Sequence, residues 1–283
     1  MRLPLALAYI VVGVAAYAEY DEKLARGPMV TMAAASYSDD PQKCMDNAMK
    51  GAKVLKQVTL DCDYFHDACS AFVVVDDANK AIGLAYRGST SAAQILDEVE
   101  ESAFEKHVAF STGGKVSKYF NDAFTKLLDG GILAALKEAR TAHPDYECWV
   151  AGHSLGGALA AMGGAYVSAN GICAPEKLKQ YTFGQPRVGD KTWANNHDTF
   201  VPATFRIAHH QDIVAHIPPE FFGYRHHMAE VYYNNTMAVG EPFRICAAQE
   251  SHACSEGDVN LSGEDHSVYF SHELGDWGRA GCV

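Results

Sequence analysis

The stretch that decides the fold is Trp149-Val150-Ala151-Gly152-His153-Ser154-Leu155-Gly156-Gly157-Ala158. Its apolar start predicts a buried strand, the G-x-S-x-G pattern predicts a tight turn, and the small residues that follow predict a helix. In such a turn the serine hydroxyl is raised into the open, and the glycines are needed because a side chain would crowd the backbone. The N–H of Leu155, at the helix start, would face an oxyanion. The stretch therefore predicts a nucleophile at Ser154.

Strands and helices alternate on both sides of this turn. Apolar runs predict strands at 71–75, 81–86, 146–151, 179–183 and 204–208, and helical spacing predicts helices at 29–58, 118–142 and 155–168. The pair Gly130-Gly131 is placed to break or kink the second helix. The alternation predicts an α/β protein with a mainly parallel sheet, whose catalytic groups lie at the carboxyl ends of the strands.

Composition limits the classes of function. The 283 residues are 48% hydrophobic and 20% charged, which is typical of a folded protein with a sizeable core. The formal net charge of −12 argues against binding to nucleic acid or to a polyanionic membrane surface, because either needs a basic face. Neutral, apolar substrates remain open.

The N-terminus is typical of a signal peptide at residues 1–18. Arg2 gives a positive end, residues 3–15 form an apolar run, and Ala16-Tyr17-Ala18 is a small-x-small cleavage signal. The run is short for a membrane span, so we expect a secreted protein with no transmembrane anchor and one domain over 19–283. Two glycosylation sequons, at Asn234 and Asn260, agree with a secretory route.

The even number of cysteines, eight, suggests disulfides in a secreted chain. Eight cysteines allow 105 pairings. Closeness in sequence favours Cys62–Cys69 and Cys246–Cys254, and Cys44–Cys282 would then tie the two ends of the domain and leave Cys148–Cys173. A metal site is a weak alternative, because no C-x-x-C pair exists.

A serine nucleophile needs a base and an acid, which follow it in the chain in this kind of fold. Asp212 is our candidate acid, because it follows the strand predicted at 204–208; Asp190, Asp198 and Asp258 are alternatives. His266 is our candidate base, because it lies in a polar loop that enters the apolar run 268–270. The other twelve histidines keep this choice open on position alone. We expect His153 to point away from the nucleophile, His209, His210 and His216 to be packing or surface groups, and His226, His227, His252 and His272 to remain alternatives.

Five ordered blocks of this chain resemble the class 3 lipases, the filamentous-fungal triacylglycerol lipases and related feruloyl esterases. They are Tyr86-Arg87-Gly88-Ser89-Thr90, the 152–158 turn, Tyr181-Thr182-Phe183-Gly184-Gln185-Pro186-Arg187-Val188-Gly189, Arg206 with 212–219, and Asp265-His266-Ser267-Val268-Tyr269. The resemblance spans roughly residues 30–282 and implies an α/β-hydrolase fold.

The resemblance assigns roles to matching residues. Ser154 becomes the nucleophile, His266 the base, and Asp212 the acid that orients it. The backbone N–H groups of Ser89 and Leu155 become the oxyanion hole. The pairs Cys246–Cys254 and Cys44–Cys282 resemble family disulfides, whereas Cys148–Cys173 has no expected counterpart. No metal or organic cofactor is implied.

The resemblance also implies a short amphipathic lid after the R-G-S segment. Here Ile95, Leu96 and Val99 could form its apolar edge, although the stretch over 92–106 is strongly acidic and lacks tryptophan. With a mobile lid, we expect a lipase that acts on neutral acylglycerols at an oil–water interface and needs no protein partner. With a fixed lid, the chain would be an esterase or feruloyl-esterase-like enzyme acting on soluble esters. A non-catalytic binding protein is the remaining alternative.

Overall fold

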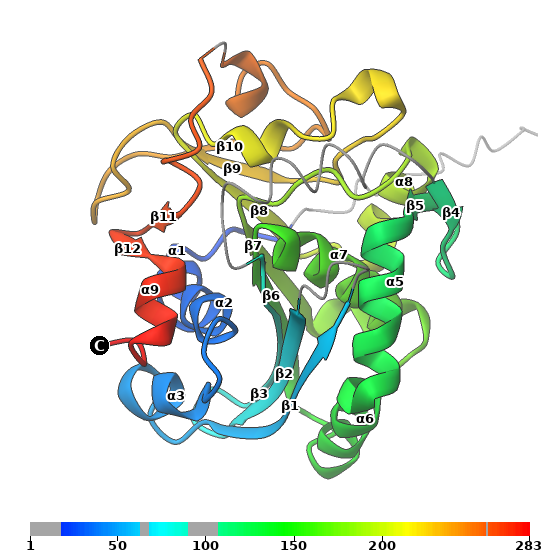
Figure 1. The fold of residues 1–283 in the computed structure, drawn as a ribbon, viewed down its shortest axis with the longest axis vertical. Helices are drawn as coiled ribbons and strands as arrows, with labels where there is room; N and C mark the ends of the chain where they lie inside the picture. Colours follow the sequence, from blue (N-terminus) through cyan, green and yellow to red (C-terminus); the bar gives the residue numbers. More distant parts are fainter. Residues whose placement is uncertain (1–17, 63–67, 90–106, 259) are drawn as a thin grey trace, which may run out of the picture.

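An eight-stranded mixed sheet forms the centre of the molecule (Figure 1). The computed structural model describes residues 18–62, 68–89, 107–258 and 260–283. The strands follow the order β1-β2-β3-β6-β7-β8-β9-β10 across the sheet. Their bounds are Lys53–Asp61, Ala68–Asp76, Ala81–Tyr86, Glu147–His153, Leu178–Phe183, Thr204–His209, Glu230–Tyr233 and Arg244–Cys246. Two short hairpins add β4 with β5 (His107–Ala109, Lys115–Ser117) and β11 with β12 (Val268–Tyr269, His272–Glu273).

The middle of the sheet is parallel and its edges are antiparallel. Strands β3, β6, β7, β8 and β9 pair in parallel, so their carboxyl ends meet at one edge of the layer. Strands β1, β2 and β10 pair antiparallel at the two sides. This architecture confirms the predicted α/β fold with a mainly parallel core.

Helices cover both faces of the sheet (Figure 1). One face packs against α1, α2, α3 and α9, with apolar contacts from Met29, Met32 and Leu274. The other packs against α5, α6, α7 and α8, with contacts from Phe120, Phe124 and Trp193. The helices span Glu22–Leu24, Val30–Ala35, Gln42–Ala48, Leu274–Arg279, Lys118–Leu127, Leu133–Ala142, Leu155–Ala169 and Lys191–Phe200, in the order named. Short helical turns are η1 (Ala25–Met29), η2 (Leu128–Ile132), η3 (Pro175–Lys177), η4 (Ile213–His216), η5 (Glu220–Phe222) and η6 (Ser255–Gly257).

The long helix predicted at 29–58 is wrong in its second half. Helical structure ends at Ala48, and Lys53–Asp61 is edge strand β1. Most side chains of β1 are exposed or half-buried, so the strand is held by its backbone pairing with β2 rather than by an apolar face of its own. The predicted interruption of the 118–142 helix at Gly130-Gly131 is confirmed, because Gly131 adopts φ 122° in the turn between α5 and α6.

Four disulfides join the eight cysteines. The pairs are Cys44–Cys282, Cys62–Cys69, Cys148–Cys173 and Cys246–Cys254. The first ties α3 to the end of the chain, and the third links β6 to the residues that follow α7. Within the described ranges, no helix has the length and apolar character that crossing a membrane requires.

Candidate active site

Ser154 lies on the sharp turn between β6 and α7. Its backbone has φ 61° and ψ −131°, a region that side chains rarely adopt, and the residue is fully buried. A Cβ on Gly152 would lie 2.1 Å from the carbonyl oxygen of Gly156, and one on Gly156 would lie 2.2 Å from that of Tyr86. The strained turn therefore depends on glycine at both flanking positions, and it raises Ser154 at the carboxyl edge of the sheet.

Asp212 and His266 form a buried pair beside this turn. Asp212 follows β8 and caps η4, where its Oδ1 accepts a 2.8 Å hydrogen bond from the N–H of Val214. The His266 Nδ1 lies 2.9 Å from Oδ1 and 3.0 Å from Oδ2 of Asp212, and both residues are 1% exposed. Because an ionised carboxylate only accepts, Nδ1 carries the proton and the other ring nitrogen, Nε2, keeps its lone pair.

Asp212 is held in its charged form. Burial alone would raise its pKa, but attraction to His266, the hydrogen bond from His266 and the further bonds from Tyr269 and Val214 hold the pKa below its ordinary value. The Tyr269 hydroxyl donates the shortest of these bonds, 2.6 Å to Oδ2. The carboxylate is thus ready to stabilise a positive imidazolium.

The Oγ of Ser154 and the Nε2 of His266 are both buried, and neither has a hydrogen-bond partner among the residues that the structure describes. Buried polar atoms are nearly always paired, so an unpaired nucleophile and an unpaired base side by side in the fold mark a place for substrate. Catalytic hydrogen bonds often tighten only when substrate arrives.

His153 supports the base, a role that sequence analysis missed. Its ring stacks on that of His266 with centroids 4.6 Å apart, and its Nε2 lies 2.7 Å from the His266 carbonyl oxygen. Because a carbonyl only accepts, Nε2 donates, and Nδ1 then accepts from the Tyr37 hydroxyl at 2.7 Å. Burial, with repulsion from His266, lowers the pKa of His153 to about 3, so the ring stays neutral. The expectation that His153 points elsewhere is therefore incomplete: it does not face Ser154, but it braces His266.

The proposed oxyanion segment also lies beside Ser154. A Cβ on Gly88 would be 3.0 Å from the Cβ of Ser154 and 2.6 Å from the carbonyl oxygen of His153, which brings the half-buried Ser89 next to the turn. Leu155 is the first residue of α7, so its N–H has no acceptor within the helix. Both backbone groups predicted from the sequence thus lie next to the Ser154 turn.

The alternative carboxylates have other partners. Asp190 caps α8 through a bond from the N–H of Trp193, Asp198 accepts from the N–H of Met228, and Asp258 accepts from the Tyr232 hydroxyl. None of these contacts is with His266 or Ser154.

The other histidines bond to backbone, carboxylate or ring partners away from Ser154. Residues 209, 216, 226 and 252 bond to backbone carbonyl oxygens, His210 to the Asp265 carboxylate, and His272 stacks on Trp277.

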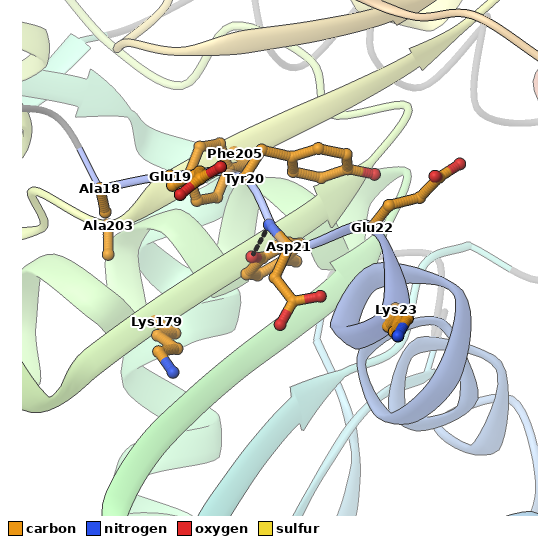
Figure 2. Close-up of a pocket in the computed structure, with 10 residues that line it drawn as sticks. Ala18, Glu19, Tyr20, Asp21, Glu22, Lys23, Lys179, Ala203 and Phe205 are labelled. Carbon is orange, nitrogen blue, oxygen red and sulfur yellow. Dashed lines mark hydrogen bonds between the residues drawn. The ribbon is translucent and has the colours of Figure 1, made fainter.

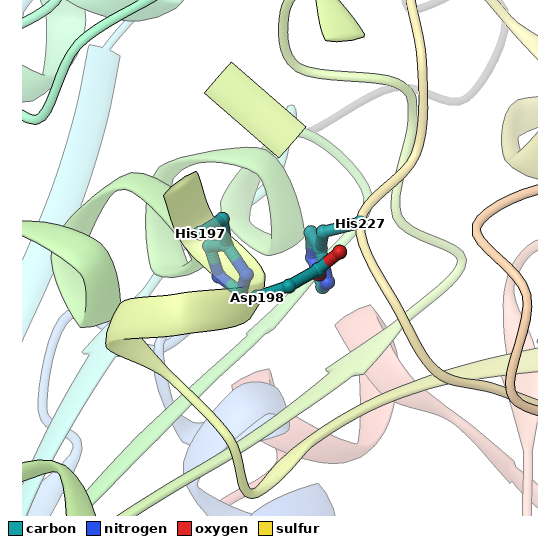
Figure 3. A group of neighbouring side chains, drawn as sticks. All are labelled: His197, Asp198 and His227. Atoms are coloured by element: carbon teal, nitrogen blue, oxygen red, sulfur yellow. The ribbon is translucent and has the colours of Figure 1, made fainter. Parts of the chain in front are cut away.

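One further group of side chains, His197, Asp198 and His227, lies close enough together to be tested as a metal site (Figure 3). The two rings stack with centroids 3.8 Å apart and planes 23° from parallel. A metal binds a histidine along the lone pair in the ring plane, so nearly parallel stacked rings do not aim at one ion. The Asp198 oxygens accept from the Met228 N–H and the Gln249 amide. The geometry therefore fits a packed structural cluster and not a metal site.

A shallow hollow lies at the other end of the parallel strands (Figure 2). It is lined by residues 18–23 together with Lys179, Tyr181, Ala203 and Phe205, and the Asp21 N–H donates to the Tyr181 hydroxyl across it at 3.2 Å. Lys179 is near the amino end of β7, whereas Ser154 and Asp212 follow the carboxyl ends of β6 and β8. The hollow is therefore separate from the Ser154 site.

Several expected features fall outside the described residues. These are residues 1–17 of the expected signal peptide and the lid residues Ile95, Leu96 and Val99. Both sequon asparagines, Asn234 and Asn260, are described and exposed.

Comparison with known proteins identifies the family. The family described as "Lipase (class 3)" matches residues 83–222. A lipase of Caenorhabditis elegans is 30% identical, with 94% of this chain and 83% of that protein covered. The "Secreted mono- and diacylglycerol lipase 1" of Fusarium solani is 32% identical over 71% of this chain and 59% of its own length.

Solved structures agree. The lipase of Rhizopus microsporus var. chinensis superposes with a TM-score of 0.79 at 27% identity, covering 92% of this chain and 88% of that one. A structure titled "A serine protease triad forms the catalytic centre of a triacylglycerol lipase" gives 0.77 at 28% identity, covering 89% and 95%. This chain therefore belongs to the class 3 lipase family, and it is a carboxylic ester hydrolase with the α/β-hydrolase fold.

Proposed function

We propose that the protein is a secreted lipase that hydrolyses neutral acylglycerols through Ser154, His266 and Asp212. The observation that carries this proposal is the buried Asp212–His266 pair, whose free Nε2 and the free Oγ of Ser154 meet at one edge of the sheet. The fungal relatives support the substrate class, since one is named for mono- and diacylglycerols and another for triacylglycerol.

The reaction is a two-step acyl transfer. His266 Nε2 takes the proton from Ser154 Oγ as the oxygen attacks the ester carbonyl, and Asp212 stabilises the imidazolium that forms. The negative oxygen of the tetrahedral intermediate accepts hydrogen bonds from the N–H groups of Ser89 and Leu155. His266 then gives its proton to the departing alcohol. Water, activated by the same base, attacks the acyl-enzyme, releases the fatty acid and restores Ser154.

The proposal includes secretion and processing. Cleavage after Ala18 would leave a chain that begins immediately before Tyr20, which packs against Tyr181, Phe205 and Phe243. Glycans at the exposed Asn234 and Asn260 are part of the same proposal. N-terminal sequencing and glycosidase treatment of protein recovered from the medium test both points.

An esterase acting on soluble esters is the second candidate, favoured by the acidic character of residues 92–106. The deciding experiment measures hydrolysis of a triacylglycerol as its concentration crosses the solubility limit, with Ser154→Ala as the blank. A sharp rise when the emulsion forms supports a lipase with a mobile lid. A smooth saturating curve supports the esterase, and a curve equal to the blank contradicts the catalytic assignment.

A further inference from the structure

An aromatic tip projects from the same edge of the molecule as the Ser154 site. Phe221 is 81% exposed and Phe222 is 46% exposed, and their ring centroids lie 4.4 Å apart. Both belong to η5, in the segment that leaves β8, passes through Asp212 and forms part of the yellow region at the top of Figure 1. An apolar aromatic side chain left this far in water is informative when it adjoins a proposed active site.

The tip is held rigidly in this exposed position. The buried guanidinium of Arg187 donates to the carbonyl oxygens of His216 and Pro218, immediately before the tip. Gly223 ends η5 with φ 87°, and the next residue but one, Arg225, donates its backbone N–H to Gly189. A segment braced on both sides cannot readily turn Phe221 inward to remove it from water.

The charges around the tip cancel. Glu220 and Arg225 flank the two phenylalanines and form an ion pair of 2.9 Å. The chain as a whole carries a formal charge of −12, which opposes approach to an anionic surface. The complementary surface is therefore neutral or zwitterionic.

The area of the tip excludes a stable protein partner of ordinary size. A phenylalanine can bury about 150–250 Å², so the two rings together offer less than the roughly 800 Å² that each partner contributes to a stable interface. A convex, rigid tip of this size is instead suited to partial insertion among lipid chains, where each inserted side chain adds to membrane affinity independently.

We infer that Phe221 is a fixed anchor that inserts into a neutral lipid surface and holds the Ser154 edge of the enzyme against it. The inference rests on the proposed lipase function for its purpose, but adsorption can be measured without catalysis. Phe221 is not a catalytic residue. It positions the enzyme on the surface that carries the substrate.

The test measures adsorption of the purified protein to phosphatidylcholine-coated triolein emulsions by sedimentation, in the Ser154→Ala background so that the surface stays intact. Phe221→Ser is expected to lower the partition coefficient about tenfold, which corresponds to about 1.4 kcal/mol. Phe221→Trp should retain adsorption. The matched control is Val239→Ser, since Val239 is 91% exposed and lies between β9 and β10. It should change adsorption less than twofold.

The outcomes separate the alternatives. Equal losses for Phe221→Ser and Val239→Ser, or no loss for either, would overturn the inference. A change in oligomeric state with unchanged adsorption would assign the tip to a second copy of the chain and also overturn it. With Ser154 present, both serine variants should hydrolyse a soluble short-chain ester at the parent rate. If the parent itself shows no ester hydrolysis while adsorption still depends on Phe221, the proposed function fails and the anchor stands.

Discussion

The hydroxyl of Tyr269 donates a 2.6 Å hydrogen bond to Oδ2 of Asp212, the carboxylate that also holds His266. Both residues are buried, so a substitution that removes the hydroxyl leaves Asp212 without one of its donors. Tyr269→Phe is expected to lower kcat on a soluble ester about tenfold with little change in KM, because the weakened carboxylate stabilises the imidazolium less well. Steady-state kinetics check this. Tyr146→Phe is the control, because its hydroxyl bonds to Asp77 on the surface and its loss should leave kcat unchanged.

Gly184 leaves no room for a side chain beside the triad. A Cβ there would lie 2.6 Å from Oδ2 of Asp212 and 2.8 Å from the Nδ1 of His266, and the residue has φ +56°. Gly184→Ala is expected to lower kcat at least about a hundredfold, because a 1 Å displacement of catalytic groups has effects of that size. Gly171→Ala controls for backbone strain, since Gly171 has φ +65° and nothing within 4 Å of the added carbon. If both variants lose activity equally, general destabilisation and not a displaced triad is responsible.

Four buried histidines make the fold sensitive to acid. Burial is the largest cause of the low pKa of His153 and His197, each about 3, and of His226 and His227, which lie well below the ordinary value. Each binds a proton more readily in the unfolded chain, where the pKa is near 6.5, than in the folded one. The stability that they contribute is therefore complete above pH 6.5 and falls as the pH drops from 6.5 toward 3.

Urea unfolding between pH 7.5 and 4.5 measures this slope. His197→Gln should flatten it by up to about 1.4 kcal/mol per pH unit, the contribution of one proton. His252→Gln should leave the slope as it is, because His252 is exposed. An equal slope in the parent and His197→Gln would contradict the prediction.

Arg187 ties the loop that follows Asp212 to the loop closed by Cys246–Cys254. Its side chain is 1% exposed and bonds bidentately to Glu250 at 3.0 Å, with Glu256 at 2.6 Å. Arg187→Met leaves Glu250 buried without its partner, and we expect a loss of about 3–5 kcal/mol in the free energy of unfolding. Arg279→Met, which breaks an exposed pair with Asp276, should change it by less than about 1 kcal/mol. Denaturant titration of both variants makes the comparison.

The sequence predicted those parts of the protein that are local in the chain. The strand–turn–helix around Ser154 could be read directly, since glycines and small residues at fixed spacing dictate it. Strand β1 could not, because its side chains are mostly exposed and its backbone is held by β2. Helix α8 and strands β9 and β10 were missed for want of a strong apolar period.

The groups that brace the triad were harder to find for a related reason. Tyr37 meets His153 across 116 residues, and Tyr269 meets Asp212 across 57. Neither tyrosine carries a local signal that distinguishes it from an ordinary core residue. The structural neighbourhood of His266 therefore had to come from the fold, whereas His266 itself came from order in the chain and family resemblance.

The disulfide between Cys44 and Cys282 closes the described domain into a covalent ring, with 238 positions between its two ends in sequence. A single cut by a protease anywhere inside that ring opens the backbone but leaves both pieces attached to one another. The nicked enzyme would migrate as one band on a non-reducing gel and as two after reduction, and its pieces could not diffuse apart. A hydrolase closed in this way can keep working among proteases after its chain has been broken.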